Sequence, residues 1–381
     1  MLKIMYLSIK KLIQKKIIII SLFFLFVLQN IIAKVEENPA LTVYKVDKTW
    51  VMLDEQGKEL FSTNKFLDIE KYSNGMLGAY IIENGYLSSV YFNNSGKIQI
   101  KSPTNLPFEF IDGLALVIQV NDTNEKDVKF GYINTKGKLI VPVQYLDVLP
   151  FSDSLAYIMN FDERGYINTT GKIVIPMKKG YAGYGFAEGL SAVSCSDRAL
   201  FGFIDKKGNL VMDYQFEEVG RFSEGLCKVY KNGFFGYINT KGIFVINPRF
   251  YEVTDFKEGR AFASRFNFDK NIHEWALIDK DGVFLTLYEF NDKKNFSEGL
   301  ASVKQDSLWK YIKLDASNNS TNLYKFAGSF KNGKAFVVTQ DDEKLFINKA
   351  EEIILKLPKD SKIVLDCRTN ERYEIEQLKI K

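Results

Sequence analysis

The chain holds one histidine, His273, which stands beside Glu274 and Trp275 in a polar stretch. An imidazole and a carboxylate next to an indole are the side chains of a small ligand site. A zinc site built on several histidines is excluded by count. We expect His273 to be a solvated loop residue, with a ligand site as the alternative. We name His273, Trp275 and Trp309 as the candidate binding residues.

Acidic residues offer a second kind of chemistry. Asp279, Asp281 and Gly282 match part of a calcium-binding loop, but a complete loop needs more oxygen ligands and a distal glutamate. Other parts of the chain carry Asn-Thr-Lys-Gly at the same place, which favours a hairpin turn over a metal site. The recurring acids Glu188, Glu224, Glu258 and Glu298 all occupy one position of a repeated motif, so we expect them to serve the fold.

Motifs of the common enzyme classes are missing from the sequence. There is no nucleophile elbow, phosphate-cradling loop or dinucleotide fingerprint. We therefore predict a protein that is not an enzyme and has no cofactor and no metal. Hydrolysis by two carboxylates needs only two acids, so a hydrolase of envelope glycans stays as the alternative.

A repeat organises the elements that must position these residues. An aromatic residue followed three positions later by glycine, or by serine in one copy, recurs at intervals of 34 to 41 residues. Periods of this length are typical of repeat architectures. The copies begin at Tyr72, Phe110, Phe151, Phe186, Phe222, Phe256, Phe296 and Phe330.

Each copy contains three strand-like pieces. In residues 222–250 these are an alternating piece at 226–230, a Phe-Gly-Tyr-Ile-Asn piece at 235–239 and a third piece at 243–250 rich in β-branched residues. Asn-Thr-Lys-Gly or a relative joins the last two, as a short hairpin loop requires. The glycine inside the second piece indicates close approach by another backbone, which we assign to stacked repeats.

These pieces predict an all-β fold of tandem antiparallel three-stranded meanders. A unit this small cannot bury its own face, so it must stack on its neighbours. We expect an open, solenoid-like array, because three strands fall short of a four-stranded propeller blade. A closed, propeller-like ring is the alternative.

The motifs together resemble the WG-repeat proteins of bacteria. The match rests on Phe-Ser-Glu-Gly-Leu-Ala-Ser-Val at 296–303, the aromatic-Gly-Tyr-Ile pieces and a Val-Ile-Pro segment at 174–176. It covers residues 72–348, with the units in 110–249 closest. The signature Trp-Gly pair is altered, since Trp275 precedes Ala276 and Trp309 precedes Lys310. The resemblance implies a β-rich repeat scaffold, often exported, without assigned catalytic residues.

The first 33 residues have a different composition from the rest. Five lysines precede an apolar run at 17–28 that only Ser21 interrupts, the plan of a signal peptide, with a membrane anchor at 17–33 as the alternative. We predict export to the periplasm, cell surface or medium. Residues 34–71 then form a degenerate repeat or cap, 72–348 the array, and 349–381 a C-terminal cap.

Charge narrows the choice of partners. The leader carries five of the 51 basic residues and no acid, which leaves 46 basic against 47 acidic residues in the body. Nucleic acid demands a basic surface and is therefore excluded. We expect a protein or a cell-wall glycan as partner, and membrane contact only through an uncleaved leader. A purely structural or adhesive surface protein is a further alternative.

Two remaining features carry smaller expectations. Polar insertions at 121–129, 266–274 and 314–322 depart from the repeat, and we expect them near one edge of the array, where binding faces of repeat proteins often lie. Cys195, Cys227 and Cys367 are odd in number and widely spaced, so we interpret them as buried apolar residues rather than a disulfide.

Overall fold

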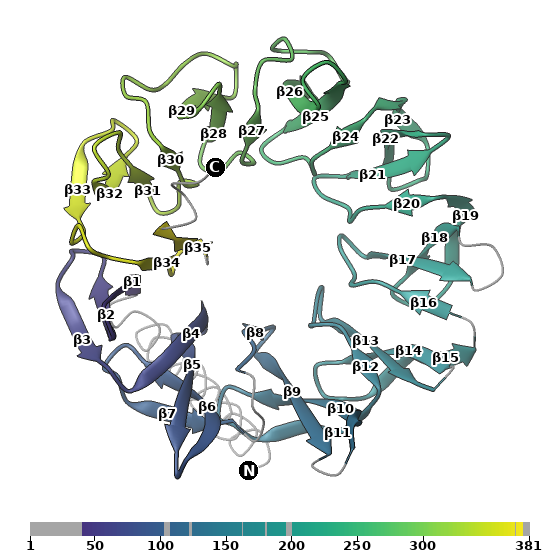
Figure 1. Ribbon diagram of the computed structural model, residues 1–381. Coiled ribbons are helices and arrows are strands. Elements are labelled where there is room, and N and C mark those ends of the chain that lie inside the picture. The colour runs from purple at the N-terminus through teal and green to yellow at the C-terminus, as the bar shows by residue number, and fades with distance from the viewer. Residues whose placement is uncertain are drawn as a thin grey trace, which may run out of the picture.

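A computed structural model describes residues 40–102, 107–121, 124–161, 163–179, 181–195, 200–369 and 371–375. Within these residues the strands form nine antiparallel sheets, arranged side by side around an open centre (Figure 1). We number these sheets as blades 1 to 9 in chain order. The predicted leader lies outside the described residues.

The bounds of the strands follow the blades. Blade 1 contains β1 (Ala40–Val46), β2 (Thr49–Asp54), β3 (Glu59–Thr63), β34 (Ile363–Asp366) and β35 (Glu371–Glu374); blade 2 contains β4 (Phe66–Ser73), β5 (Met76–Glu83), β6 (Tyr86–Asn93) and β7 (Ile98–Lys101); blade 3 contains β8 (Phe110–Ile111), β9 (Leu114–Asn121), β10 (Asn124–Asn134) and β11 (Leu139–Tyr145). Blade 4 contains β12 (Asp147–Val148), β13 (Leu155–Asn160), β14 (Glu163–Asn168) and β15 (Ile173–Lys179); blade 5 contains β16 (Tyr181–Gly183), β17 (Leu190–Cys195), β18 (Phe201–Asp205) and β19 (Leu210–Phe216); blade 6 contains β20 (Glu218–Val219), β21 (Leu226–Lys231), β22 (Phe234–Asn239) and β23 (Phe244–Phe250). Blade 7 contains β24 (Glu252–Val253), β25 (Arg260–Asn267) and β26 (Ile272–Asp279); blade 8 contains β27 (Asp292–Lys293), β28 (Leu300–Gln305) and β29 (Leu308–Lys313); blade 9 contains β30 (Phe326–Ala327), β31 (Lys334–Val338), β32 (Lys344–Asn348) and β33 (Ile353–Lys356).

The fold is thus a nine-bladed β-propeller, and the predicted open array of three-stranded units is wrong. The three-piece interpretation missed the first strand of the unit, which brings the sheet to four strands in blades 2 to 6 and 9, while blades 7 and 8 contain three strands. In blades 4 and 6 it is the two-residue strand β12 or β20, which pairs with the next strand through Asp147 and Val148, or Glu218 and Val219. These short strands form one edge of their sheets, and the equivalent strand β8 of blade 3 lies on the side that faces the middle of the ring (Figure 1). With these short strands each unit can form a propeller blade, and the array of blades closes into a ring.

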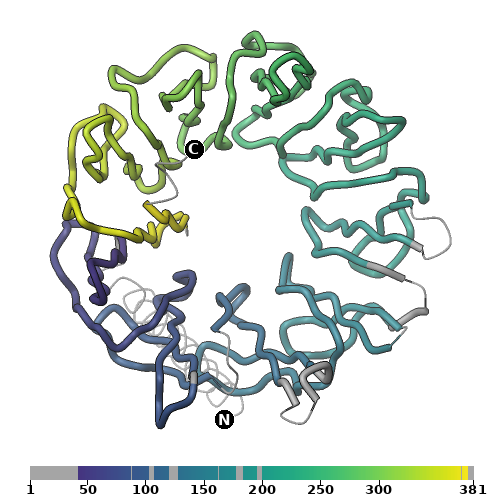
Figure 2. The backbone as a smooth tube through the Cα atoms, in the orientation of Figure 1, coloured from purple at the N-terminus to yellow at the C-terminus, as the bar shows by residue number. Residues whose placement is uncertain are grey.

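The first described strand and one of the last two pair with each other in blade 1. Strand β1 pairs with β34 over four residues, with Val43 opposite Leu365, and the Thr42 hydroxyl donates to the Leu365 carbonyl at 2.9 Å. The tube in Figure 2 shows the purple start of the described chain beside its yellow end. The segments that we expected to form caps, 34–71 and 349–381, thus contain β1 to β3 and β34 to β35, which are strands of one blade. Closure leaves no exposed terminal sheet.

Glycine in the third strand of a blade has a reason different from the one expected. A Cβ at Gly236 would lie 2.5 Å from the Ile246 carbonyl oxygen, in the neighbouring strand of the same blade. That strand bulges there, because Tyr237 faces Ile246 while Phe235 faces Phe250. The bulge accommodates Pro248, which could not donate to a regular ladder. The close approach therefore lies within a blade, and its assignment to stacked repeats is wrong.

The turn between the third and fourth strands matches the expectation. The Asn134 side chain accepts hydrogen bonds from the amides of Lys136 and Lys138, both at 3.0 Å, and Gly137 has φ of 75°. Asp279 does the same for the amides of Asp281 and Val283. The segment that matched part of a calcium loop is a hairpin turn.

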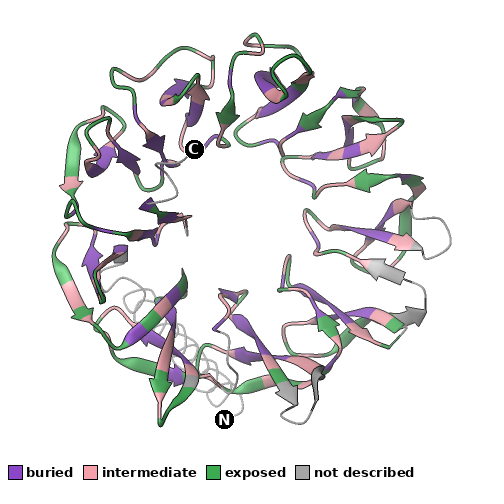
Figure 3. Ribbon diagram, viewed as in Figure 1, coloured by how far each residue is buried: buried purple, intermediate pink, exposed green. Residues whose placement is uncertain are grey.

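Tyrosine–phenylalanine pairs join five of the blades to the next one. The tyrosine after the strand glycine packs against the phenylalanine that opens the following unit, with ring centroids 4.7 Å apart for Tyr237 and Phe256. The Tyr237 hydroxyl also donates to the Thr254 carbonyl at 2.7 Å. Figure 3 shows the resulting buried stretches inside the blades and exposed residues around them. Equivalent ring pairs are Tyr91–Phe110, Tyr132–Phe151, Tyr166–Phe186 and Tyr311–Phe330.

Candidate functional site

The repeated glutamates lie in the turns between the first and second strands and bind the next blade. The carboxylate of Glu224 accepts hydrogen bonds from the amides of Glu258 and Gly259, and that of Glu258 from Glu298 and Gly299. Both residues of each Glu-Gly pair have φ between 50° and 90°, so the whole turn is left-handed. Equivalent hydrogen bonds from backbone amides of the next blade are accepted by Asp112, Asp153, Glu188 and Glu298. The structure gives these acids a part in the fold, as we expected.

Removal of one such bond should weaken the ring. Burial opposes ionisation of Glu224, but the amides of Gly259 and Glu258, together with Lys280, outweigh it and lower the pKa of Glu224. For Glu224→Ala we expect a loss of about 1–2 kcal/mol in the free energy of unfolding at pH 7. Because the pKa of Glu224 is lower in the folded than in the unfolded state, its carboxylate stabilises the ring at pH values above the unfolded pKa of about 4.3. That stability is lost as the pH falls below this value.

Urea denaturation at pH 7 and at pH 3.5 measures this effect. The difference between Glu224→Ala and the unmodified chain should shrink at the lower pH. Glu218→Ala, which removes an exposed acid from the same blade, is the control and should change stability little. A Glu224→Ala variant as stable as the control at pH 7 would contradict the role of the carboxylate.

His273 lies in β26 and is half-buried, not in a solvated loop, so that expectation is wrong. Its Nδ1 is 3.3 Å from the Ser264 hydroxyl and its Nε2 is 3.7 Å from a Glu252 carboxylate oxygen. The rings of Tyr251 and Phe266 pack against it at 5.3 and 5.2 Å. His273 therefore belongs to an aromatic cluster at the β25–β26 hairpin.

Glu274 braces that hairpin. Its carboxylate accepts hydrogen bonds from Arg265 at 2.7 and 2.9 Å, from Asn267 at 2.9 Å and from Lys270 at 3.2 Å. These three partners, Arg265 first, lower the pKa of Glu274 to about 2. Its oxygens are thus committed to the hairpin, which leaves Glu274 little capacity to bind a ligand.

The two candidate tryptophans are core residues of neighbouring blades. Trp275 is 7% exposed and Trp309 is 6% exposed. Each packs in the apolar layer toward the next blade, Trp275 with Phe290 and Phe296, and Trp309 with Tyr324. Neither ring has the free face that stacking on a sugar requires. His273 stacks on Trp275 at 6.3 Å, and the Lys293 ammonium lies 3.9 Å from the centre of the Trp275 ring.

Trp309 lines a pocket of about 230 Å³ between blades 8 and 9. Asp292 also lines it, and Lys304 lies across the strands from both Asp292 and Trp309. These registers place the pocket at the end of the blades that carries the hairpin between the second and third strands. We call it the lysine pocket; its other lining residues are Lys293, Lys294, Lys325 and Phe326.

Two lysines of this pocket are held by acids outside its lining. The Lys294 ammonium lies 2.7 Å from Glu371 of β35 and 4.8 Å from the centre of the Phe326 ring. The Lys325 ammonium lies 3.0 Å from Asp342. Burial lowers the pKa of Lys293, against the opposing charges of Asp292 and Glu252. The cations are thus positioned rather than left to sample solvent.

The other blades provide an internal reference for the pocket. The place of Lys293 is taken by Val148, Val219 and Val253 in blades 4, 6 and 7, and by Ala327 in blade 9. A valine at this place is buried or half-buried. Burying an ammonium instead costs solvation energy, and the propeller forms without it in the other blades. Sequence reasoning missed this departure, although an alignment of the units contains it.

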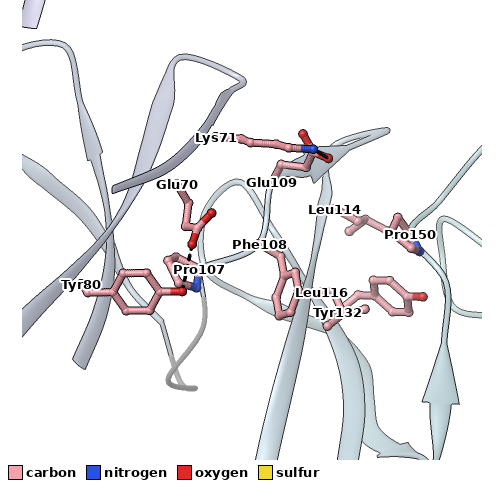
Figure 4. Close-up of a pocket in the computed structure, with 10 residues that line it drawn as sticks. All are labelled: Glu70, Lys71, Tyr80, Pro107, Phe108, Glu109, Leu114, Leu116, Tyr132 and Pro150. Carbon is pink, nitrogen blue, oxygen red and sulfur yellow. Dashed lines mark hydrogen bonds and ion pairs between the residues drawn. The ribbon is translucent and has the colours of Figure 1, made fainter. Parts of the chain in front are cut away.

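A second pocket, of about 340 Å³, lies between blades 2 and 3 (Figure 4). Phe108, Leu114 and Leu116 line its apolar part. Its charged rim is already paired, since Lys71 lies 3.0 Å from Glu109 and the Tyr80 hydroxyl donates to Glu70 at 3.1 Å; the figure draws both.

The three polar insertions do not share one edge. Residues 266–274 form the end of the β25–β26 hairpin, and of the insertion at 121–129 the described residues, 121 and 124–129, belong to the paired strands β9 and β10. Residues 314–322 follow β29, at the opposite end of the third strand. They lie on the two different faces of the ring, so the expected common edge is wrong.

Metal and membrane features can be stated for the described part of the chain only. There, no group of three or more histidine, cysteine, aspartate or glutamate side chains is placed to hold a metal ion. No helix in that part has the length and apolar character needed to cross a bilayer. Cys227 and Cys367 are buried and form no disulfide, as interpreted from the sequence, and the Cys195 side chain lies outside the described set.

The sequence matches the family model described as WG containing repeat at residues 130–160, 165–197, 201–233, 235–265 and 275–309. Residues 130–309 belong to this family. Each WG containing repeat begins in the third strand of one blade and runs into or past the second strand of the next, as in the repeat from Phe235 of β22 to Arg265 of β25. A repeat is therefore not a blade but the link between two blades. Trp275 and Trp309 each stand at a boundary of the last matched repeat.

Solved structures bear on the fold of the WG containing repeats. One described as the crystal structure of the eukaryotic initiation factor has a TM-score of 0.60 at 12% identity, and the match covers 84% of this chain and 96% of that one. BamB from Moraxella catarrhalis (10% identity, 83% and 84% covered) and the WD40 beta propeller domain of Doa1 (11%, 80% and 95%) have TM-scores of 0.35 and 0.27, too low to carry an argument. No curated protein matches the sequence.

Proposed function

We propose that the protein is an exported, non-catalytic binding scaffold of the bacterial cell envelope, with a cell-wall glycan as its partner. One observation carries the proposal. Lys293, which stands where three other blades have valine, lies 3.9 Å from the centre of the Trp275 ring and lines the pocket that also contains Trp309. Departures that a fold does not require are where a specific function belongs in a repeat protein.

Two further observations support a binding rather than a catalytic role. The repeated carboxylates that might have served as acids are engaged by the amides of the next blade. The body of the chain has nearly balanced charge, which suits a local site better than a broad electrostatic surface. The basic leader with its apolar run supports export.

Co-sedimentation tests this function. The purified protein is mixed with purified cell-wall material and centrifuged, with and without soluble glycan fragments as competitor. We expect the protein in the pellet, and its release by the competitor. A protein that stays in the supernatant at every wall concentration would contradict a glycan partner, and cross-linking in intact cells would then identify a protein partner instead.

A further inference from the structure

We propose that one face of the ring binds a polysaccharide chain by stacking exposed aromatic side chains on its sugars. This face carries the hairpins between the second and third strands of the blades, and we call it the hairpin face. The inference rests on the proposed function, which supplies the class of partner, and it locates a contact surface. Tyr86, Phe161 and Phe268 are 78%, 83% and 79% exposed, the highest values among the aromatic side chains that the structure describes. All three lie on such hairpins, in blades 2, 4 and 7.

The turns of these hairpins do not need an aromatic residue. Blades 1, 2, 4, 6 and 8 each have a two-residue turn here, formed in blade 1 by the β1–β2 hairpin. Its first residue has φ between 46° and 56°, a left-handed backbone that asparagine and aspartate tolerate. Four blades have such a residue, namely Asp47, Asn84, Asn232 and Asp306. Blade 4 has Phe161 instead, which strains the backbone and exposes an apolar ring, so we assign this ring to binding rather than to the fold.

The residue after the turn gives a second internal reference. Tyr86 and Phe234 hold this position in blades 2 and 6, whereas blades 1 and 8 have Thr49 and Leu308. Exposed aliphatic residues at the opposite end of the blades differ, because they recur as the first residue of the fourth strand. They are Ile98, Leu139, Ile173, Leu210 and Ile353. Recurrence indicates a role in the repeat itself, and the aromatic residues of the hairpin face lack that recurrence.

The chemistry around the rings suits a sugar. The C–H face of a sugar stacks on an aromatic ring, and its hydroxyl groups need hydrogen-bond partners. Asn84 and Asn232 are exposed and stand two residues before Tyr86 and Phe234. Within the described part of the chain neither side-chain amide is hydrogen-bonded to the protein. Each amide can both donate and accept, so each of these two hairpins offers a ring and a partner for hydroxyl groups.

Charge disfavours an anionic lipid surface or another polyanion as the occupant. Such partners are held by free lysine and arginine side chains. The hairpins β5–β6, β21–β22 and β25–β26 contain five basic side chains, and each is already bound to the protein. The pairs are Lys228 with Asp255, Lys231 with Gln215, Arg265 and Lys270 with Glu274, and Arg260 with the Leu314 carbonyl.

The spacing of the rings indicates a polymer rather than a single sugar. The rings stand on separate blades, and blades 2 and 7 lie across the open centre from each other (Figure 1). One sugar can stack on one ring only. A chain that reaches several rings gains affinity with each contact, because every contact after the first forms within the same complex.

Calorimetric titration of the purified protein tests the hairpin face. The probes are soluble cell-wall glycan strands, the disaccharide unit of those strands and vesicles of phosphatidylcholine. We expect the strands to bind about a hundredfold more tightly than the disaccharide. Phe161→Asn and Tyr86→Thr, which copy residues of other blades, should each weaken strand binding by about tenfold, and the double variant should weaken it further. Leu139→Thr, which removes an exposed apolar side chain from the opposite end of blade 3, is the matched control and should leave affinity unchanged.

The outcomes separate the two proposals. An unfolding temperature of Phe161→Asn at or above that of the unmodified chain would show that the variant is folded. Absent strand binding, wild-type affinity in the folded variants, equal affinity for strand and disaccharide, an equal loss in Leu139→Thr, or tighter binding to vesicles would each overturn the hairpin face as a glycan site. Wall co-sedimentation that persists in the double variant would leave the scaffold and reject this face. Strand binding without co-sedimentation would support the face and reject the intact wall as partner.

Discussion

Chains that lack residues 359–381 are expected to lose the closed ring. These residues carry β34 and β35, and β34 joins β1 in blade 1. Five of their apolar side chains are buried in blade 1 or against blade 9: Val364, Leu365, Cys367, Tyr373 and Ile375. Burial of such side chains contributes about 1.5–3 kcal/mol each, so their combined loss approaches the whole stability of a domain, about 5–15 kcal/mol.

Size-exclusion chromatography with small-angle scattering measures this loss as an increase in radius, and urea denaturation measures it as a lower, broader transition. A synthetic peptide of residues 359–381, added in excess, should restore the compact radius, since strand addition completes the blade. A truncated chain with the radius and the unfolding midpoint of the full chain would show that the pairing of β1 with β34, which we call the seam, does not maintain the ring.

The substitution Arg368→Met should have the next largest effect. Asp366 is fully buried, and the Arg368 guanidinium binds it through two nitrogens at 2.9 and 2.6 Å. Arg368 also donates to the carbonyl of Lys331 at 2.6 Å, which ties the closing strand to blade 9. Removing the cation leaves a buried carboxylate without a counter-ion, and we expect a loss of about 3–5 kcal/mol in the free energy of unfolding.

The pH dependence gives this prediction a second readout. Burial raises the pKa of Asp366, and Arg368 works against that rise. In Arg368→Met the opposing charge is absent, so the folded-state pKa rises further above the unfolded value. The folded state then binds the proton more strongly, and lowering the pH from 7 to 5 should recover part of the lost stability.

A matched variant separates the ion pair from its surroundings. Asp366→Asn combined with Arg368→Met removes both charges and should be more stable than Arg368→Met alone at pH 7. Urea denaturation at the two pH values measures all three proteins. An Arg368→Met loss that is independent of pH and unrelieved by Asp366→Asn would attribute the effect to the bonds with blade 9 instead.

Local patterns in the sequence predicted the parts of the fold that depend on neighbours in the chain. The alternating strands and the turn at Asn134 and Gly137 follow from residue types a few positions apart. The innermost strands could not be predicted in this way, because a two-residue strand such as Asp147–Val148 has no measurable periodicity. The choice between open and closed arrays depended on that missing strand.

Contacts between residues far apart in the chain were the second feature that the sequence did not predict. The partners of the Glu224 carboxylate lie 34 and 35 residues further on, and Leu365 pairs across the seam with Val43. No local pattern specifies such pairs. The lysine pocket could have been found from the sequence, since an alignment of the units places Lys293 where three other units have valine. We named Trp309 as a binding residue because we expected an exposed ring. The ring is buried, yet it lines that pocket.

The seam in blade 1 also sets the order in which the molecule can be assembled. Every other blade pairs strands from one continuous stretch of sequence, so it can form as soon as that stretch is available. Blade 1 alone waits for residues about 320 positions later, as the bond from Thr42 to Leu365 shows. Until the last strands emerge from synthesis, β1 presents an unpaired edge, which is the element most prone to join another chain. The interval between the first blade and the last strand is therefore when this protein most needs protection from aggregation.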